Sequence, residues 1–214
     1  YNNYQYEVRF LRAYFYFNLV RQYGDVPFID HFLSADESNT LSRTPAKDIF
    51  DYIISECDDI KDLIIEDYAN LPADVVLPSE SPETGRVNKA TVLALKARAA
   101  LYAASPLFNT DNNPELWHRA ATANKELLDY CVNERGMKLV SDYASLWDKN
   151  NYKNATDELI FGRRANRESS TMESYNYPVG IEGGNGGNCP TQNLVDAYET
   201  TDGCPVRLVD GVWT

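Results

Sequence analysis

The stretch from Arg163 to Asn188 gathers aromatic, amide and guanidinium side chains that suit a sugar ligand. A sugar ring has an apolar C–H face, which aromatic rings cover, and a rim of hydroxyl groups, which amide and guanidinium groups bind. Tyr175 and Tyr177 would share one side of the chain if this segment were extended. The candidate ligand-binding residues are Arg167, Tyr175, Asn176, Tyr177, Asn185 and Asn188, with Arg163 and Asn166 in the same segment.

Two other interpretations of this segment compete with ligand binding. The tyrosines could anchor a long loop onto neighbouring helices. The glycines from Gly183 to Gly187 contain a Gly-x-Gly element, but no βαβ unit precedes them, so a phosphate cradle is disfavoured. Backbone freedom in a tight loop explains these glycines better.

No arrangement of catalytic or metal-binding residues is evident in the sequence. His31 and His118 are far apart, and there is no Gly-x-Ser-x-Gly motif and no P-loop. Asp157 and Glu158 would point to opposite faces of a strand, so they could not flank one glycosidic bond. The acidic residues between Asp48 and Asp62 fit a solvated helix face better than a metal site. We therefore predict no enzyme activity, no metal and no cofactor.

The four cysteines lack the spacing of a metal site. Cys57 and Cys131 lie within helical patterns and are expected to be free thiols in the core. Cys189 and Cys204 bracket a short segment near Pro and Gly residues. In an oxidising compartment they could form a disulfide, and the sequence favours this pairing and two free thiols equally.

Composition indicates a folded, acidic chain. The 214 residues carry a formal net charge of -12, and 43% are apolar and 12% aromatic. This charge argues against nucleic acid or an anionic membrane as a partner. The chain begins at Tyr1 with no signal peptide and no transmembrane run, and we interpret it as a segment of a longer protein.

A long helix is predicted from Glu7 to Gly24, where a glycine closes the helix and Pro27 then favours extended backbone. Its apolar residues form two stripes at helical spacing. The stripes are Val8, Leu11, Phe15 and Leu19, and Phe10, Tyr14 and Phe17. We therefore expect a helix that is buried on several sides and does not touch the ligand.

Three more helices are predicted before residue 143. One runs from Pro45 to about Asp67 with Thr44 as its cap, and an alanine-rich one runs from Asn88 to Pro106. Another starts at Pro114 and ends before Gly136, and its expected buried residues are Leu116, Ala120, Ala123, Leu127, Leu128 and Cys131. The fold class is therefore mainly α, an irregular tetratricopeptide-like helical array over residues 1–142.

Residues 143–214 are predicted to form a loop-rich part with little regular structure. We expect a helical turn at Ala144–Trp147, a short strand at Glu158–Arg164 and a short helix at Gln192–Tyr198. That last helix would start at Pro190-Thr191, with Leu194, Val195 and Tyr198 facing inward.

Three segments resemble the SusD/RagB family of outer-membrane nutrient-binding lipoproteins. They are FLRAYFYFNLVRQYGDVPFI at Phe10–Ile29, VNKATVLALKARAALYAASPLFN at Val87–Asn109 and CPTQNLVDAYETTDG at Cys189–Gly203. They occur in the family's order and nearly span the chain. The resemblance implies one partial SusD-like domain, residues 1–214, with a loop-rich, ligand-facing side.

The resemblance also implies a function and a location. Family members bind glycans without catalysis and deliver them to a SusC-type TonB-dependent transporter. They face outward from the cell outer membrane, held by a lipid anchor on an N-terminal cysteine that this chain lacks. Because some relatives are linked to peptide uptake, a peptide- or protein-binding tetratricopeptide-like scaffold is the alternative.

Overall fold

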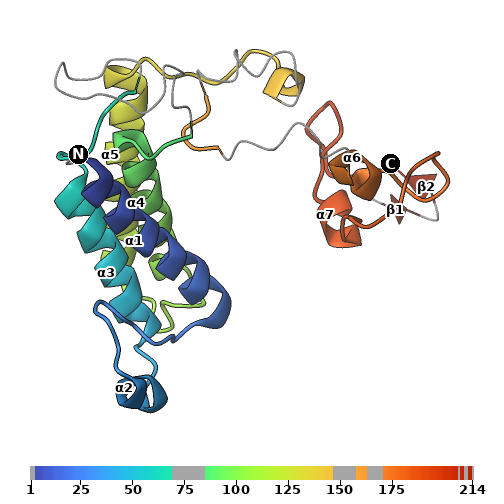
Figure 1. The fold of residues 1–214 in the computed structure, drawn as a ribbon. Helices are drawn as coiled ribbons and strands as arrows, with labels where there is room; N and C mark the ends of the chain where they lie inside the picture. Colours follow the sequence, from blue (N-terminus) through green and yellow to red (C-terminus); the bar gives the residue numbers. More distant parts are fainter. Residues whose placement is uncertain are drawn as a thin grey trace. The chain divides into compact units, whose positions relative to one another are not determined.

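The computed structural model describes residues 3–68, 85–146, 158–162, 171–206, 208–209 and 212–213. The chain divides into two compact units, Tyr1–Arg163 and Arg164–Thr214, and each is described by itself. In the first unit, the helices α1, α3, α4 and α5 lie side by side as a bundle (Figure 1). The boundary between these units differs from the one we predicted between a helical part, 1–142, and a loop-rich part, 143–214. The two divisions rest on different criteria, and the predicted one stays a prediction.

Helix α1 spans Asn3–Tyr23 and ends as predicted at Gly24. Gly24 adopts a φ of 68°, in the left-handed region, and its N–H donates to the Val20 carbonyl at 2.9 Å. Burial is restricted to one face, formed by Asn3, Phe10, Ala13, Tyr16, Phe17 and Val20. The expectation of burial on several sides is wrong, because Val8, Leu11, Phe15 and Leu19 are exposed.

Helix α3 spans Ala46–Ile60 and packs along α1. It ends earlier than predicted, and Thr44 does not cap it. The Ala46 N–H instead donates to the Asp25 carboxylate at 2.7 Å, while Thr44 pairs with Val26 in an isolated antiparallel bridge. A short helix that was not predicted, α2 at Ala35–Thr40, lies in the chain between Val26 and Thr44 and has a capping box at its start.

Helices α4 (Lys89–Ala104) and α5 (Pro114–Leu128) form the second antiparallel pair. The predicted cap of α4 is confirmed, since the Asn88 side chain accepts from the Thr91 N–H at 3.0 Å. Buried alanines of both helices let their backbones approach closely. Among them are Ala97, Ala100 and Ala104 of α4 and Ala120 and Ala123 of α5.

Helix α5 passes directly into a π-helix, η1 at Asp129–Glu134, before Gly136 closes the segment at a φ of 66°. Cys131 and Tyr130 are buried there against Leu93 and Ala90 of α4. Leu128 was predicted to be buried but is exposed. Leu128 is the last residue of α5 and precedes the π-helix, whereas Cys131 within the π-helix is buried as predicted.

A buried lysine joins three helices of the bundle. Lys96 of α4 donates to Asp58 of α3 and to Glu126 of α5, both at 2.6 Å. Lys61, just after α3, pairs with the same two carboxylates. Burial alone would raise the pKa of Asp58 and Glu126, but the hydrogen bonds from the two lysines outweigh burial and lower both values.

The remaining elements are short. A 3-10 helix, η2 at Tyr143–Leu146, lies close to the predicted turn, but residues 158–162 form turns and bends where we predicted a strand. The second unit holds α6 (Thr171–Asn176), α7 (Gln192–Asp196) and a hairpin of β1 (Leu208–Val209) and β2 (Val212–Trp213). Thr191 caps α7 as predicted.

These elements confirm the predicted fold class, mainly α with tetratricopeptide-like helical pairs. The inward orientation that we predicted for α7 is wrong, since Leu194, Val195 and Tyr198 are all exposed. No helix in the described part of the chain is long and apolar enough to cross a membrane.

Candidate functional site

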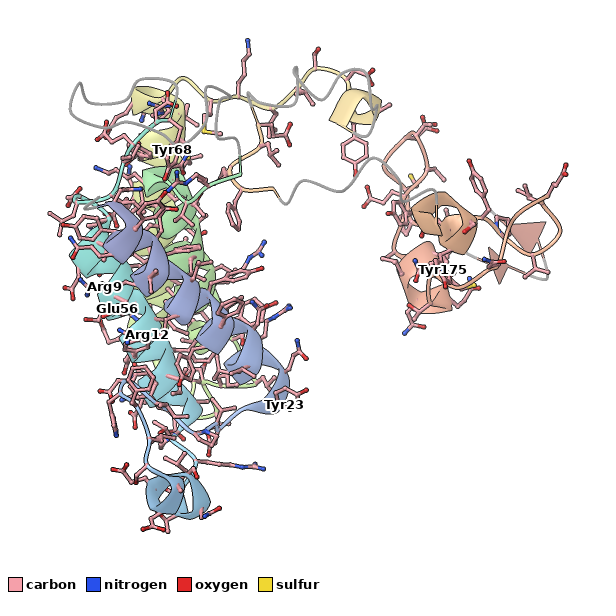
Figure 2. The ribbon with its side chains drawn as sticks, in the orientation of Figure 1. Arg9, Arg12, Tyr23, Glu56, Tyr68 and Tyr175 are labelled. Atoms are coloured by element: carbon pink, nitrogen blue, oxygen red, sulfur yellow. The ribbon has the colours of Figure 1, made fainter. Side chains whose placement is uncertain are left out.

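Within the candidate ligand-binding segment, the two tyrosines lie at the end of α6 and not in extended backbone. Tyr175 is in the last turn of this helix, and Tyr177 follows its end (Figure 2 labels Tyr175). The condition for both rings to share one side, an extended backbone, is therefore not met at Tyr175, which is helical. Both rings are nevertheless available to a ligand, with exposed fractions of 53% and 45%.

Backbone hydrogen bonds hold the glycine-rich loop against the tyrosine segment. The Asn185 N–H donates to the Ser174 carbonyl at 2.8 Å, and the Gly186 N–H donates to the Tyr177 carbonyl at 2.9 Å. A third bond runs from the Asn188 N–H to the Tyr175 carbonyl, at 3.0 Å. Residues 174–177 and 185–188 are thereby fixed beside each other. We call these two runs together the Tyr-Asn cluster.

This loop needs glycine for two reasons: neighbouring atoms lie too close for a Cβ, and some residues adopt a left-handed backbone conformation. A Cβ at Gly184 would be 2.3 Å from the Pro178 carbonyl oxygen, and a Cβ at Gly187 would be 2.6 Å from the Tyr175 ring. Gly186 has a φ of 58°, in the left-handed region. The glycines were predicted to serve a tight loop, but the contact between Gly187 and the Tyr175 ring was missed. Nothing in the spacing of the sequence signals which residue a loop glycine will contact.

The asparagines add exposed amide groups next to the rings. The Asn188 side chain donates from Nδ2 to Oδ1 of Asn176 at 3.0 Å, and both residues are exposed. Asn185 is exposed as well. The structure thus brings together five of the six predicted site residues. Arg167 lies outside the described residues, as do Arg163 and Asn166.

The cluster offers an arrangement suited to polyhydroxylated ligands. Two exposed phenol rings supply apolar faces and hydroxyl groups, and three amides supply both donors and acceptors. Because backbone hydrogen bonds hold the loop in place, these groups would lose less conformational freedom on binding a ligand than the same groups in a free chain.

Cys189 and Cys204, on either side of α7, are free and exposed in this structure. The disulfide considered for them is not formed here. The Cys189 Sγ donates instead to the Gly186 carbonyl at 3.4 Å, next to the Tyr-Asn cluster. The other two cysteines are buried free thiols, as predicted, and burial raises the pKa of Cys57 to about 12.

Among the described residues of the helical bundle, a groove of about 440 Å³ lies beside the ends of α3, α4 and α5. Lysines and carboxylates alternate around it, but they are paired with one another. Lys89 binds Asp62 at 2.8 Å and Lys125 binds Asp129 at 2.5 Å. The mutual pairing of these charges favours a structural role over a binding role.

Charged side chains elsewhere in the bundle are also engaged in packing contacts. Arg9 binds Glu56 and Asp59, and Arg12 donates to the Tyr52 hydroxyl at 2.7 Å (Figure 2). The hydrogen bond to Glu56 is the main cause of the raised pKa of Arg9. Within the described ranges, no group of three or more His, Cys, Asp or Glu residues could hold a metal ion.

Comparison with known proteins gives relatives of one kind. No family model matches the chain. The chain is 25% identical over 178 residues to SusD-like protein P2 of Formosa agariphila. The matched residues make up 81% of this chain and 30% of that protein. A crystal structure of a SusD-like protein from Bacteroides fragilis matches with a TM-score of 0.72 and 27% identity, over 96% of this chain and 37% of that one.

A further solved structure shares the fold at lower identity. Surface glycan-binding protein A from Bacteroides uniformis aligns with a TM-score of 0.51 and 23% identity, over 74% of this chain and 30% of that one. The chain therefore spans about a third of the length of these relatives.

Proposed function

We propose that this chain, a homologue of SusD-like proteins in sequence and in fold, binds extracellular glycans without catalysing their breakdown. The observation that carries the proposal is the Tyr-Asn cluster, in which Tyr175 and Tyr177 lie exposed beside three asparagine amides. The fold is also that of a protein named for glycan binding. Arg167 is proposed as a further contact of the ligand.

The uptake role extends this proposal to the cell surface. A SusD-like protein that binds glycans would deliver them to a SusC-type TonB-dependent transporter, at the extracellular face of the outer membrane and on a lipid anchor. Purification of the protein from its native outer membrane under mild detergent tests this part. Co-purification of a TonB-dependent transporter supports it, and recovery of the protein alone from a membrane that contains the transporter contradicts it.

A binding measurement tests the glycan site. Tyr175→Ala and Tyr177→Ala should each weaken the affinity for a bound oligosaccharide about tenfold, or ~1.4 kcal/mol, because each removes one ring that covers a sugar face. Isothermal titration calorimetry measures this, after a panel of polysaccharides and peptides has given a binder. Tyr198→Ala is the control, since Tyr198 is exposed in the same unit but outside the cluster.

Two outcomes would overturn the proposal. If both cluster variants bind the oligosaccharide as tightly as the wild type, the ligand does not use these rings. If the protein binds peptides from the panel and no glycan, the peptide-binding scaffold is the better description of its function.

A further inference from the structure

The unit that contains the Tyr-Asn cluster has an excess of negative charge. Residues 171–206, which include the cluster, contain five acidic residues and no lysine, arginine or histidine. The whole unit, Arg164–Thr214, contains seven acidic residues and three arginines, a net charge of -4. The cluster itself consists of tyrosine, asparagine, glycine and serine, so it supplies no positive charge to offset this excess.

Within residues 171–206, the carboxylates have no cation to pair with. Four of them are exposed: Glu182, Asp196, Glu199 and Asp202. Asp196 accepts a hydrogen bond from the Gln192 side chain at 2.6 Å, but this amide is neutral and leaves the charge uncompensated. The helical bundle differs, since carboxylates there are paired, as Glu56 is with Arg9 at 2.9 Å. The second unit therefore has a local negative field of its own.

Glu182 is the carboxylate in the loop that joins the two runs of the Tyr-Asn cluster. Two backbone hydrogen bonds shape this loop. The Ile181 N–H donates to the Pro178 carbonyl at 3.3 Å, and the Gly184 N–H donates to the Ile181 carbonyl at 2.9 Å. The Glu182 side chain is exposed to solvent. A fixed loop thus keeps one full negative charge close to the candidate binding site.

The field of these carboxylates reaches a ligand at the cluster. A compact unit of this length has a radius of gyration of about 10 Å. The Debye length is about 30 Å at 10 mM salt and about 8 Å at 150 mM, so all the carboxylates of the unit act at low salt and only the nearest ones at high salt. Carboxylate or sulfate groups on a sugar would be repelled, neutral hydroxyl groups would not, and ammonium groups would be attracted.

We propose that the Tyr-Asn cluster selects glycans without carboxylate or sulfate groups, because the unpaired carboxylates of its own unit repel anionic sugars. Neutral glycans bind, and a glycan with free amino groups binds at least as tightly as its N-acetylated form. Arg167, proposed above as a further contact, is one of the three arginines already counted, and its guanidinium donates equally to neutral hydroxyl groups. The inference rests on the proposed glycan binding and adds the charge class of the ligand.

Oligosaccharide pairs that differ mainly in charge test this on the full-length gene product. The pairs are oligogalacturonate with its methyl ester, chitosan oligosaccharide with its N-acetylated form, and the binder from the panel with a derivative whose primary hydroxyl groups are oxidised to carboxylates. Isothermal titration calorimetry measures each at about 10 and 150 mM salt. The neutral member should bind at least about threefold more tightly than the anionic one at low salt, and this ratio should shrink at high salt.

Variants of Glu182 separate charge repulsion from other causes of selectivity. At about 10 mM salt, Glu182→Gln should raise the affinity for the anionic member about threefold and Glu182→Lys about tenfold, because one repulsive charge is removed or reversed. The affinity for the neutral member should change less than about twofold, since the proposal includes no contact between Glu182 and the sugar. Glu182→Asp keeps the charge and should behave as the wild type.

A second control distinguishes the local field from the overall charge of the protein. Asp36→Asn removes one exposed carboxylate from α2 in the first unit, which is the same change of net charge. It should leave the ratio of neutral to anionic affinity unchanged. If Asp36→Asn alters that ratio as much as Glu182→Gln does, the net charge of the chain causes the selectivity, and the proposal is overturned.

The remaining outcomes distinguish this inference from the proposed function. Glycan binding in which the anionic member of a pair binds as tightly as the neutral one, or tighter, overturns the charge selectivity alone. An unchanged ratio in Glu182→Lys does the same. Binding of peptides and of no glycan instead removes the proposed function, and the inference falls with it.

Discussion

The two compact units differ in what holds them together. In the first, large apolar side chains such as Phe50, Ile53 and Ile60 are completely buried between helices. In the described part of the second, the large apolar side chains of α7 are exposed, and the loop around Tyr175 is fixed by backbone hydrogen bonds and closely packed glycines. Packing of large side chains therefore stabilises the first unit, whereas backbone hydrogen bonds and close glycine contacts hold the described loop of the second.

The largest expected effect comes from removing volume in the first unit. Phe50→Ala should lower the free energy of unfolding by about 3–5 kcal/mol, because it leaves a cavity and removes the edge-on contact with Phe108 at 4.9 Å. Urea unfolding followed by circular dichroism measures this. Leu194→Ala in the second unit is the contrasting variant, with an expected change within about 0.5 kcal/mol.

A large loss of stability in Leu194→Ala would contradict this comparison. It would mean that α7 is covered by apolar contacts. A loss of less than about 1 kcal/mol in Phe50→Ala would show that the bundle can collapse around the missing ring.

An intermediate effect is expected from a backbone change in the second unit. Gly184→Ala should disturb the Tyr-Asn cluster, because the new Cβ would meet the Pro178 carbonyl oxygen and the backbone must shift. We expect a local cost of about 1–3 kcal/mol, with little change in the unfolding of the helical bundle. Amide chemical shifts of residues 174–188 measure the disturbance directly.

Glu182→Ala is the matched control, since Glu182 is exposed in the same loop. It should leave those chemical shifts nearly unchanged beyond its neighbours. If Gly184→Ala also leaves them unchanged, the loop accommodates the methyl group and close approach of the backbone is not required there.

The smallest effect is a pH dependence that belongs to the first unit. The pKa values of Asp58 and Glu126 are lowered in the folded state, so the unfolded chain takes up their protons first as the pH falls. Their stabilisation is complete above the ordinary values of 3.8 and 4.5, and it is lost as the pH drops through the lowered values. Melting temperatures at about pH 7, 5 and 3 should therefore fall mainly in the last step.

Lys96→Met provides the comparison for this pH dependence, because it removes the buried cation that both carboxylates contact. The variant should be less stable at neutral pH and lose less stability on acidification. If its melting temperature falls as steeply as that of the wild type, other carboxylates cause the acid sensitivity.

The sequence predicted the helical bundle well where local signals were strong. Asn88 as a cap and Gly24 as a terminator act within one helical turn, so their effects could be predicted without tertiary information. The exposed side of α1 was not predictable, because apolar residues lie nearly all round the helix and the neighbours decide which of them are buried. The exposure of Leu128, at the end of α5, could likewise not be predicted from its place in the apolar period.

The candidate site was predicted by composition but not by geometry. Tyrosine, asparagine and glycine in one segment indicated a loop that could bind a sugar, and five of the six named residues are brought together. The α6 helix was missed because Thr171–Asn176 has no apolar periodicity. The pairing of residues 174–177 with 185–188 is a tertiary arrangement that residue types alone do not determine.

The Val26–Thr44 bridge has a practical consequence for engineering. Together with the hydrogen bond from the Ala46 N–H to Asp25, it holds the two ends of the α1–α3 connection next to each other. These contacts do not depend on the residues between Val26 and Thr44. Because the entropy of closing a loop grows only slowly with its length, extra residues there cost little. The exposed residues 41–43, which follow α2 and have no regular structure, are therefore a permissive place for an epitope tag or a fluorophore.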